Sequence, residues 1–254
     1  KYHLDEPVWR QYLRYLGGVV QGDLGPSYKY LDRGVTEIIS ETLPTSIVLG
    51  SLAMLFAVLV AFPAGLCAAY FRDSLIDRCC MSVAALGISL PNFVLGALLI
   101  WAMALQLGWL QIGRWDDWSS VILPMITLGA APTAFLASLL RSTLIETMGE
   151  DFVRTARAKG LKETTVIVKH ALLHSLIPVL TVLGPLAAAL LTGSFVVEFV
   201  FAIPGMGRFF ITAVTDRDYP LIMGVTLVYT ALLVCANLVV DLLYSFVDPR
   251  IRVE

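Results

Sequence analysis

The residues best suited to contact another protein lie in the segment 151–161, Asp-Phe-Val-Arg-Thr-Ala-Arg-Ala-Lys-Gly-Leu. Cationic donors alternate here with small side chains that allow a close approach, and Gly160 permits a sharp turn because it has no Cβ. We expect a short helix, a turn at Gly160 and a second helix. This surface suits docking in a partner's groove; the alternative is a solvated basic loop. The candidate residues are Arg154, Thr155, Ala156, Arg157, Ala158, Lys159, Gly160 and Leu161.

Three polar residues in apolar surroundings are candidates for a translocation path or a gate: Asn92, Ser194 and Glu198. An acid at mid-bilayer costs roughly 2.5–3.5 kcal/mol, so Glu198 should face protein or water. It could contact the amino group of a cargo, but we favour a contact with Arg208, Arg217 or the backbone N–H groups of 204–207. Asn92 could line a path or satisfy carbonyls that Pro91 frees. Ser194 suits either a pore or a close helix contact.

A metal site is not expected. His170 and His174 are four residues apart and would share one helix face, but two ligands without a third make a poor site. No CxxC pair or Cys/His cluster with ligand spacing occurs in the sequence, so we interpret the four cysteines as packing residues.

The elements that must position these residues are membrane helices. Hydrophobic residues make up 57% of the chain and charged residues 15%, which excludes a soluble domain of this length. No basic tract with interleaved aromatics suggests nucleic acid. Each of five blocks without Asp, Glu, Lys or Arg is long enough to span a bilayer of about 30 Å as a helix. The blocks are 43–71, 79–113, 118–140, 170–197 and 219–240. We therefore predict an all-α, polytopic membrane protein.

The distribution of basic residues predicts the orientation. Lys and Arg concentrate in 141–169, which the positive-inside rule places in the cytoplasm. Counting spans then places 72–78 and the C-terminus inside, and 114–117 and 201–218 outside. Residues 1–42 fall outside as an extracytoplasmic segment before the membrane domain 43–254. Because nothing in 1–42 could direct its own export, we expect a preceding span, six in all with five visible here.

The basic loop, at about 146–175, resembles the EAA loop of ABC-importer permeases. In that family a Glu-Ala-Ala tract is followed by a Gly and later by Ile-x-Leu-Pro. Here Arg154-Thr155-Ala156 stands at the first tract and His170-Ala171-Leu172 at the second, a variant typical of the peptide and nickel permease subfamily. Within an oligopeptide importer, the chain resembles the first of two permease subunits, usually called the B subunit. The tracts 22–28, 198–207, 218–220 and 241–252 also resemble that subfamily in the same order.

The resemblance implies a type I ABC-importer fold in the inner membrane and a role in peptide uptake. The implied partners are a second, related permease forming a heterodimer, two ATPase subunits and an extracytoplasmic peptide-binding protein. The chain has no GxxxxGK[ST] sequence, so ATP and Mg²⁺ are expected in the ATPase subunits, and the chain is expected to be neither an enzyme nor a cofactor carrier. Energy would enter through the loop residues 154–161.

Three alternatives stay open on the sequence. A nickel or other small-solute permease shares the loop variant. An ion-driven secondary transporter would usually have an internal repeat, which is not found here. An intramembrane enzyme would need an HExxH motif or a Ser/His pair within the spans, and neither is present.

Overall fold

The computed structural model describes residues 6–113, 115, 117–192 and 195–247. These residues form helices joined by short connections, and the only extended pairing among them is an isolated bridge between Pro26 and Gly34. The predicted all-α class is therefore confirmed. The elements are α1 (Val8–Val20), α2 (Val35–Tyr70), α3 (Leu75–Ser89), α4 (Asn92–Leu99), the π-helix η1 (Ile100–Gln106), α5 (Trp118–Thr147), α6 (Asp151–Ala158), α7 (Glu163–Thr165), the π-helix η2 (Val166–Ala171), α8 (Leu172–Thr192), α9 (Phe195–Val200), α10 (Met206–Asp216) and α11 (Tyr219–Val247).

Four continuous helices in the described part of the chain are long and apolar enough to cross a membrane. They are α2, α5, the continuous run Glu163–Leu191 and α11. The helix α2 begins at Val35, so residues 35–42 form its first turns. At about 1.5 Å per residue, even the 21-residue span in α11 reaches across a hydrocarbon core of about 30 Å.

The expected single span over 79–113 is two helices. The pair α3 and α4–η1 is bent by 109° at the break around Pro91. Proline has no N–H to donate and disfavours helical backbone in the residue before it, and Leu90 is accordingly extended, with φ −85° and ψ 123°. The prediction of five spans holds only if this bent pair is counted as one.

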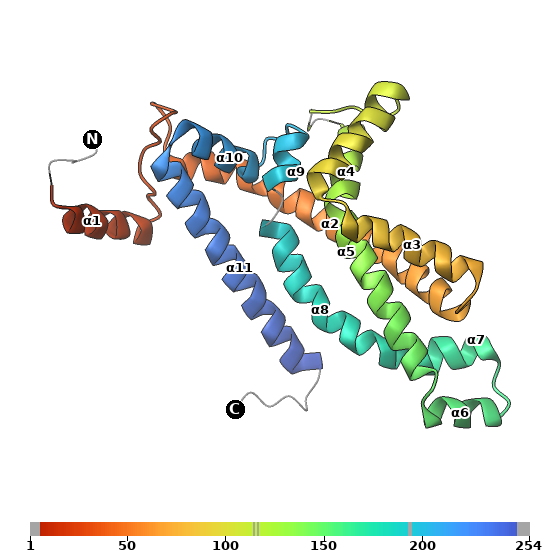
Figure 1. The fold of residues 1–254 in the computed structure, drawn as a ribbon. Coiled ribbons are helices and arrows are strands. Elements are labelled where there is room, and N and C mark those ends of the chain that lie inside the picture. Colours follow the sequence, from red (N-terminus) through yellow and green to blue (C-terminus); the bar gives the residue numbers. More distant parts are fainter. Residues whose placement is uncertain (1–5, 114, 116, 193–194, 248–254) are drawn as a thin grey trace.

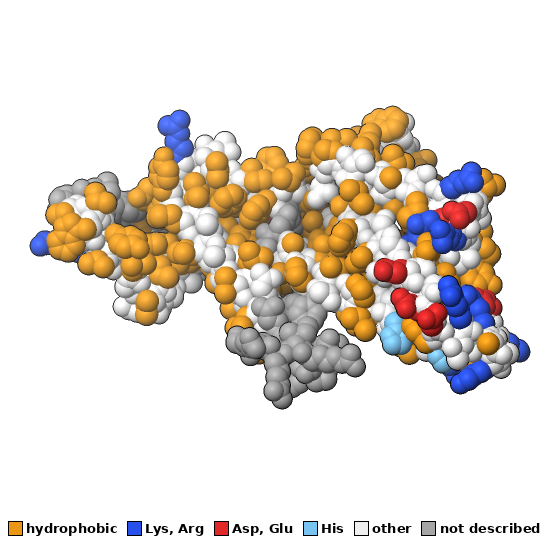
Figure 2. Space-filling model, turned by 60° about the horizontal axis from the view of Figure 1, so that its bottom comes forward, with side chains coloured by type: hydrophobic (Ala, Val, Ile, Leu, Met, Phe, Trp, Pro, Cys, Tyr) orange, Lys and Arg blue, Asp and Glu red, His pale blue; other side chains and the backbone are white. Residues whose placement is uncertain are grey.

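The molecule has two distinct ends (Figure 1). The α6–η2 hairpin (151–171) and the α2–α3 turn lie at one, which we call the hairpin end. The helices α1, α9 and α10 and the start of α11 lie at the other, which we call the α10 end. Most of the charged side chains visible in Figure 2 gather over the hairpin end, and apolar side chains cover much of the remaining surface in that view.

Small residues bring the long helices close together. A Cβ at Gly50 of α2 would lie 2.7 Å from the carbonyl oxygen of Leu190, and one at Gly129 of α5 would lie 2.9 Å from that of Ala53. At these positions the neighbouring backbone leaves no room for a Cβ. Small residues of this kind allow membrane helices to approach closely and pack against each other.

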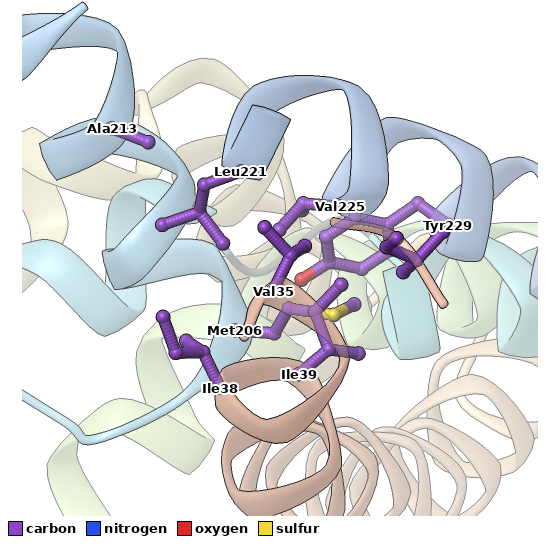
Figure 3. Close-up of a cluster of buried hydrophobic side chains, with 9 residues drawn as sticks. Val35, Ile38, Ile39, Met206, Ala213, Leu221, Val225 and Tyr229 are labelled. Atoms are coloured by element: carbon purple, nitrogen blue, oxygen red, sulfur yellow. The ribbon is translucent and has the colours of Figure 1, made fainter. Parts of the chain in front are cut away.

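Buried clusters fix both ends of the bundle. At the α10 end, side chains of α2, α10 and α11 meet, among them Ile38, Met206 and Val225 (Figure 3). At the hairpin end, the cluster formed by Ala69, Leu144, Val153, Ala156, Val166 and Ala171 joins α2, α5, α6 and η2. The hairpin is therefore packed on the ends of two membrane helices.

Candidate functional site

The hairpin is attached by one face of α6. Val153 and Ala156, three residues apart, are both buried and pack in the cluster that contains Leu144 of α5 and Val166 of η2. Residues at this spacing share a helix face, so the remaining residues of α6 point outwards. Ala156, which we expected to give a partner room to approach, instead contributes to packing within the chain.

The turn expected at Gly160 is present. Gly160 has φ +77°, and its N–H donates to the carbonyl of Arg157 at 2.9 Å. An added Cβ would have nothing within 4 Å. The requirement for glycine within this chain is therefore the left-handed backbone alone, which L-residues adopt at a cost.

Opposite charges join the two arms of the hairpin. The guanidinium of Arg157 donates to both carboxylate oxygens of Glu163, with Nη2–Oε1 2.6 Å and Nε–Oε2 3.2 Å. This contact raises the pKa of Arg157 above its usual range. Both side chains are nearly half exposed, so the pair shapes the turn more than it stabilises the fold.

The outward face of the hairpin is a mixture of charged and small side chains. Arg154 is held only loosely, with Nη1 3.6 Å from the carboxylate of Asp151. The exposed members of the predicted set are Arg154, Thr155, Arg157, Ala158, Lys159, Gly160 and Leu161. Seven of the eight candidate residues are thus accessible to a partner at the hairpin end.

The two histidines near the hairpin have different surroundings. His170 is half-buried in η2, whereas His174 is exposed in α8 with its ring centroid 4.7 Å from that of Phe152. Within the described residues, no three His, Cys, Asp or Glu side chains are grouped so that they could hold a metal.

At the α10 end, Glu198 is fully buried and holds the start of α10. Its Oε2 accepts hydrogen bonds from the backbone N–H groups of Gly207 (2.7 Å) and Arg208 (3.3 Å). The hydroxyl oxygen of Ser46 accepts from the N–H of Met206 at 2.9 Å. A carboxylate at a helix N-terminus satisfies unpaired donors and complements the helix dipole. The backbone N–H groups considered for Glu198 are thus among its partners, and the guanidinium of Arg208 donates to the carbonyl of Ala202.

The close approach of Glu198 explains two glycines. A Cβ at Gly205 would clash with the Glu198 carboxylate and lie 2.8 Å from the Ser46 oxygen. One at Gly207 would lie 2.6 Å from the Cα of Phe195. The α9–α10 segment (195–216) therefore folds back on itself only because these positions have no side chain.

The other path candidates are less defined. Asn92 is half-buried and begins α4, directly after the bend at Pro91. Ser194 lies outside the described residues. Whether Asn92, Ser194 and Glu198 line a path stays a prediction.

Sequence reasoning missed a buried ion pair at the hairpin end. Arg141 of α5 binds Asp77 of α3 through two contacts, Nε–Oδ1 2.6 Å and Nη2–Oδ2 2.7 Å. Asp77, whose side chain is 5% exposed, also accepts from the N–H of Asp73 at 2.9 Å. The two residues are 64 positions apart, so no local sequence pattern indicates that they form a pair. The sequence predicted only that both charges lie near the same membrane face.

A second buried acid was also missed. Asp218 accepts hydrogen bonds from the hydroxyl of Ser27 and from the N–H groups of Tyr28 (3.1 Å) and Leu221 (3.3 Å). Lys29 lies 3.3 Å from Asp216. The tracts 22–28 and 218–220, noted separately in the sequence, therefore contact each other and tie the segment before α2 to the start of α11.

Comparison with known proteins agrees with this architecture. Residues 61–253 match the family described as the inner membrane component of binding-protein-dependent transport systems. The chain belongs to this family. It is therefore a multi-pass inner-membrane permease component, as expected.

Relatives extend the match over the whole chain. A dipeptide transport system permease protein, DppB, of Bacillus subtilis is 44% identical over 253 residues, which are 100% of this chain and 82% of the relative. An oligopeptide transport system permease protein, OppB, of Haemophilus influenzae is 42% identical over 254 residues, 99% of this chain and 83% of the relative.

Two solved structures resemble the fold of this permease. One is the inward-facing MetNI methionine ABC transporter, with a TM-score of 0.68, 15% identity and coverage of 83% of this chain and 96% of the other. The second is an amino acid ABC transporter with histidines, with a TM-score of 0.66, 18% identity and coverage of 82% and 93%. These matches confirm the predicted type I importer fold.

Proposed function

We propose that this chain is one permease subunit of an ATP-driven importer of short peptides. The observation that carries the proposal is the similarity to dipeptide and oligopeptide permeases, 39–44% identity over at least 99% of the chain. Identity of this extent includes the helices, the hairpin and the α9–α10 segment. The substrate class is thus inferred from the relatives, and the structure supplies the parts that such a role requires.

The proposed assembly contains four further subunits. A second, related but different permease completes the path, and two ATPase subunits bind ATP and Mg²⁺ and dock against the two permeases. A peptide-binding protein delivers the cargo at the opposite membrane face. The hairpin residues Arg154, Thr155, Ala158 and Leu161 are exposed, which supports docking of one ATPase against them.

The hairpin end would face the cytoplasm. The α2–α3 turn and the hairpin lie at the same end (Figure 1), and Asp77 at the start of α3 binds Arg141 near the end of α5. This shared end agrees with the positive-inside assignment of 72–78 and 141–169. The C-terminal tail, also assigned to the cytoplasm, lies outside the described residues from 248 onwards.

The helix α5 would transmit ATPase closure through the membrane. Its hairpin end contributes Leu144 to the cluster with Val153, and its α10 end contributes Leu123 to a buried cluster with Phe201. A displacement of the hairpin is therefore passed to a packed helix whose far end touches the α9–α10 segment. Closely packed interiors transmit such shifts as rigid-body motion.

Glu198 would act as a gate residue by holding the α9–α10 segment and not by binding the cargo. Its carboxylate is fully buried and engaged by the N–H groups of Gly207 and Arg208. A gate of this kind opens and closes as a unit, because the start of α10 cannot shift without losing these contacts.

Uptake by reconstituted vesicles tests the proposal. In vesicles whose interior corresponds to the cytoplasm, with the binding protein outside, the complete transporter is expected to accumulate a labelled short peptide only when ATP is enclosed inside. Excess unlabelled peptide should abolish the signal and excess Ni²⁺ should leave it unchanged. ATP-dependent uptake of labelled Ni²⁺ with none of labelled peptide would assign the chain to nickel uptake, and peptide uptake driven by an ion gradient without ATP would reject the importer.

A further inference from the structure

The helix α1 has three chemically different sides. The side that meets the rest of the chain contains its least exposed residues, Gln11, Tyr15, Gly18 and Val19. Val19 packs against the buried cluster of α2, α10 and α11, and a Cβ at Gly18 would lie 2.7 Å from the carbonyl oxygen of Asp23. This side accounts for the attachment of α1 to the protein and leaves the other two sides uncovered.

The second side is apolar and exposed. Trp9, Leu13, Leu16 and Val20 recur at the spacing of one helix face, and Tyr12 lies beside them. Trp9 is 59% exposed and Val20 88% exposed. A stripe of five large apolar residues along a 13-residue helix would be unfavourable in water.

The third side is cationic. It holds Arg10 and Arg14, and the sequence of α1 contains no acidic residue. The Arg10 guanidinium lies 5.0 Å from the ring centroid of Trp9, and Arg14 pairs with Glu6 at 2.7 Å just before the helix. The basic side is thus next to the aromatic edge of the apolar stripe, as in helices that lie in the boundary between headgroups and acyl chains.

The position of α1 matches this chemistry. A groove between α1 and the start of α11 is lined by Tyr12 and Tyr15 on one side and by Pro220 and Met223 on the other. The exposed face of α11 begins there, with Tyr219, Met223 and Leu227 at intervals of four residues. The helix α11 is long and apolar enough to span the membrane, so its exposed face is expected to meet lipid, and Tyr12 at the edge of the apolar side of α1 lies next to the start of that face.

We infer that α1 is an interfacial helix that lies in the membrane boundary at the α10 end. Trp9, Leu13 and Leu16 insert among the acyl chains, and Arg10 and Arg14 face the lipid phosphates and water. Aromatic residues at the level of the headgroups are typical of membrane boundaries. The inference goes beyond the proposed function, because it concerns the support of the segment before α2 and holds for any cargo.

Spin labels on α1 test the inference in the complete transporter, reconstituted in nanodiscs of phosphatidylethanolamine and phosphatidylglycerol. The four native cysteines, Cys67, Cys79, Cys80 and Cys235, are first replaced by serine, and this background must retain uptake when reconstituted in vesicles. Single cysteines are then labelled at Leu13 and Leu16 on the apolar side, at Arg10 and Arg14 on the basic side and at Val19 on the protein side.

Collision rates with oxygen, which concentrates in lipid, and with a water-soluble nickel chelate distinguish the three sides. We expect oxygen to dominate at Leu13 and Leu16, the chelate to dominate at Arg10 and Arg14, and both rates to be low at Val19. Chelate-dominated collisions at Leu13 and Leu16 would show that water covers the apolar side. Low rates for both reagents there would show that a protein partner covers it. Either result overturns the inference, and neither depends on transport.

Discussion

Replacing Gly160 by aspartate separates a docking surface from a solvated loop. Gly160 has φ +77°, where a residue with a Cβ costs about 1–2 kcal/mol. Apart from the glycine itself and its two chain neighbours, no atom of this chain lies within 4 Å of the position of the new Cβ. The variant therefore meets no steric obstacle inside the chain, and the site lies outside the long apolar helices, so membrane insertion should be unchanged.

The internal cost bounds the effect that the chain alone can produce. If all of the strain opposed the folded turn, about 1–2 kcal/mol would change an equilibrium by a factor of roughly 5–30. In the assembled transporter the new side chain would also clash with a docked ATPase. It would place a negative charge on a surface that carries Arg154, Arg157 and Lys159. We therefore expect Gly160→Asp to lower ATPase attachment or substrate-stimulated hydrolysis by more than this factor, with delivery from the binding protein unaffected.

A matched glycine supplies the control. Gly108 follows η1, has φ +65° and also has nothing within 4 Å of an added Cβ. Gly108→Asp introduces the same strain and charge away from the hairpin. Gly160→Asn, with a residue that tolerates the left-handed region, should retain most activity.

Uptake and substrate-stimulated ATP hydrolysis are measured in reconstituted complexes of the wild type and each variant. Unchanged uptake and stimulation in Gly160→Asp would refute the coupling role of the hairpin. An equal loss in Gly108→Asp would show that the effect is a general consequence of strain and charge.

Three further substitutions probe the buried polar contacts. Asp77→Asn should destabilise the chain by about 3 kcal/mol, because it leaves Arg141 without its buried counter-charge; thermal unfolding of the purified complex measures this, and an unchanged midpoint would contradict it. Gly205→Ala should abolish uptake while ATPase attachment persists, since the methyl group clashes with a buried carboxylate and must displace the start of α10; wild-type uptake would contradict the gate. Asp218→Asn should make the segment 21–34 more sensitive to protease, because four hydrogen-bond donors contact this carboxylate, whereas Asp216→Asn, which removes only a partly exposed ion pair, should not; equal sensitivity in the two variants would contradict the prediction.

The membrane helices were predictable because charge-free apolar blocks of this length are typical of transmembrane helices. The break within 79–113 was not. The helices α2 and α5 continue through Pro44, Pro63, Pro124 and Pro132, so a proline alone does not identify a bend. At Pro91 both halves pack on α5, and the second half also packs on α9. The start of α3 is bound to α5 through Asp77, and a Cβ at Gly96 of α4 would lie 3.1 Å from the ring of Phe201. Such tertiary contacts are invisible in one sequence.

The hairpin was predictable in outline but not in orientation. Gly160 indicated the turn because a left-handed residue is the ordinary requirement there. The eight residues of α6 are too few for apolar periodicity to identify a buried side with certainty, although Val153 and Ala156 have the correct spacing. Ala156 was therefore grouped with Ala158, and only the packing of α6 on Leu144 separates their roles.

The contacts at the hairpin end define which parts should move together. Pro124 and Pro132 each remove a backbone hydrogen bond from α5, so the stretch from Thr133 to Thr147 is the longest part of that helix in which every residue has an N–H to donate. This stretch carries Leu144, which packs on the hairpin, and Arg141, which binds the start of α3 through Asp77. We therefore expect a force on the hairpin to displace the ends of α2, α3 and α5 as one body. Any bending in α5 should then fall nearer its α10 end, where Leu123 and Leu128 meet the α9–α10 segment.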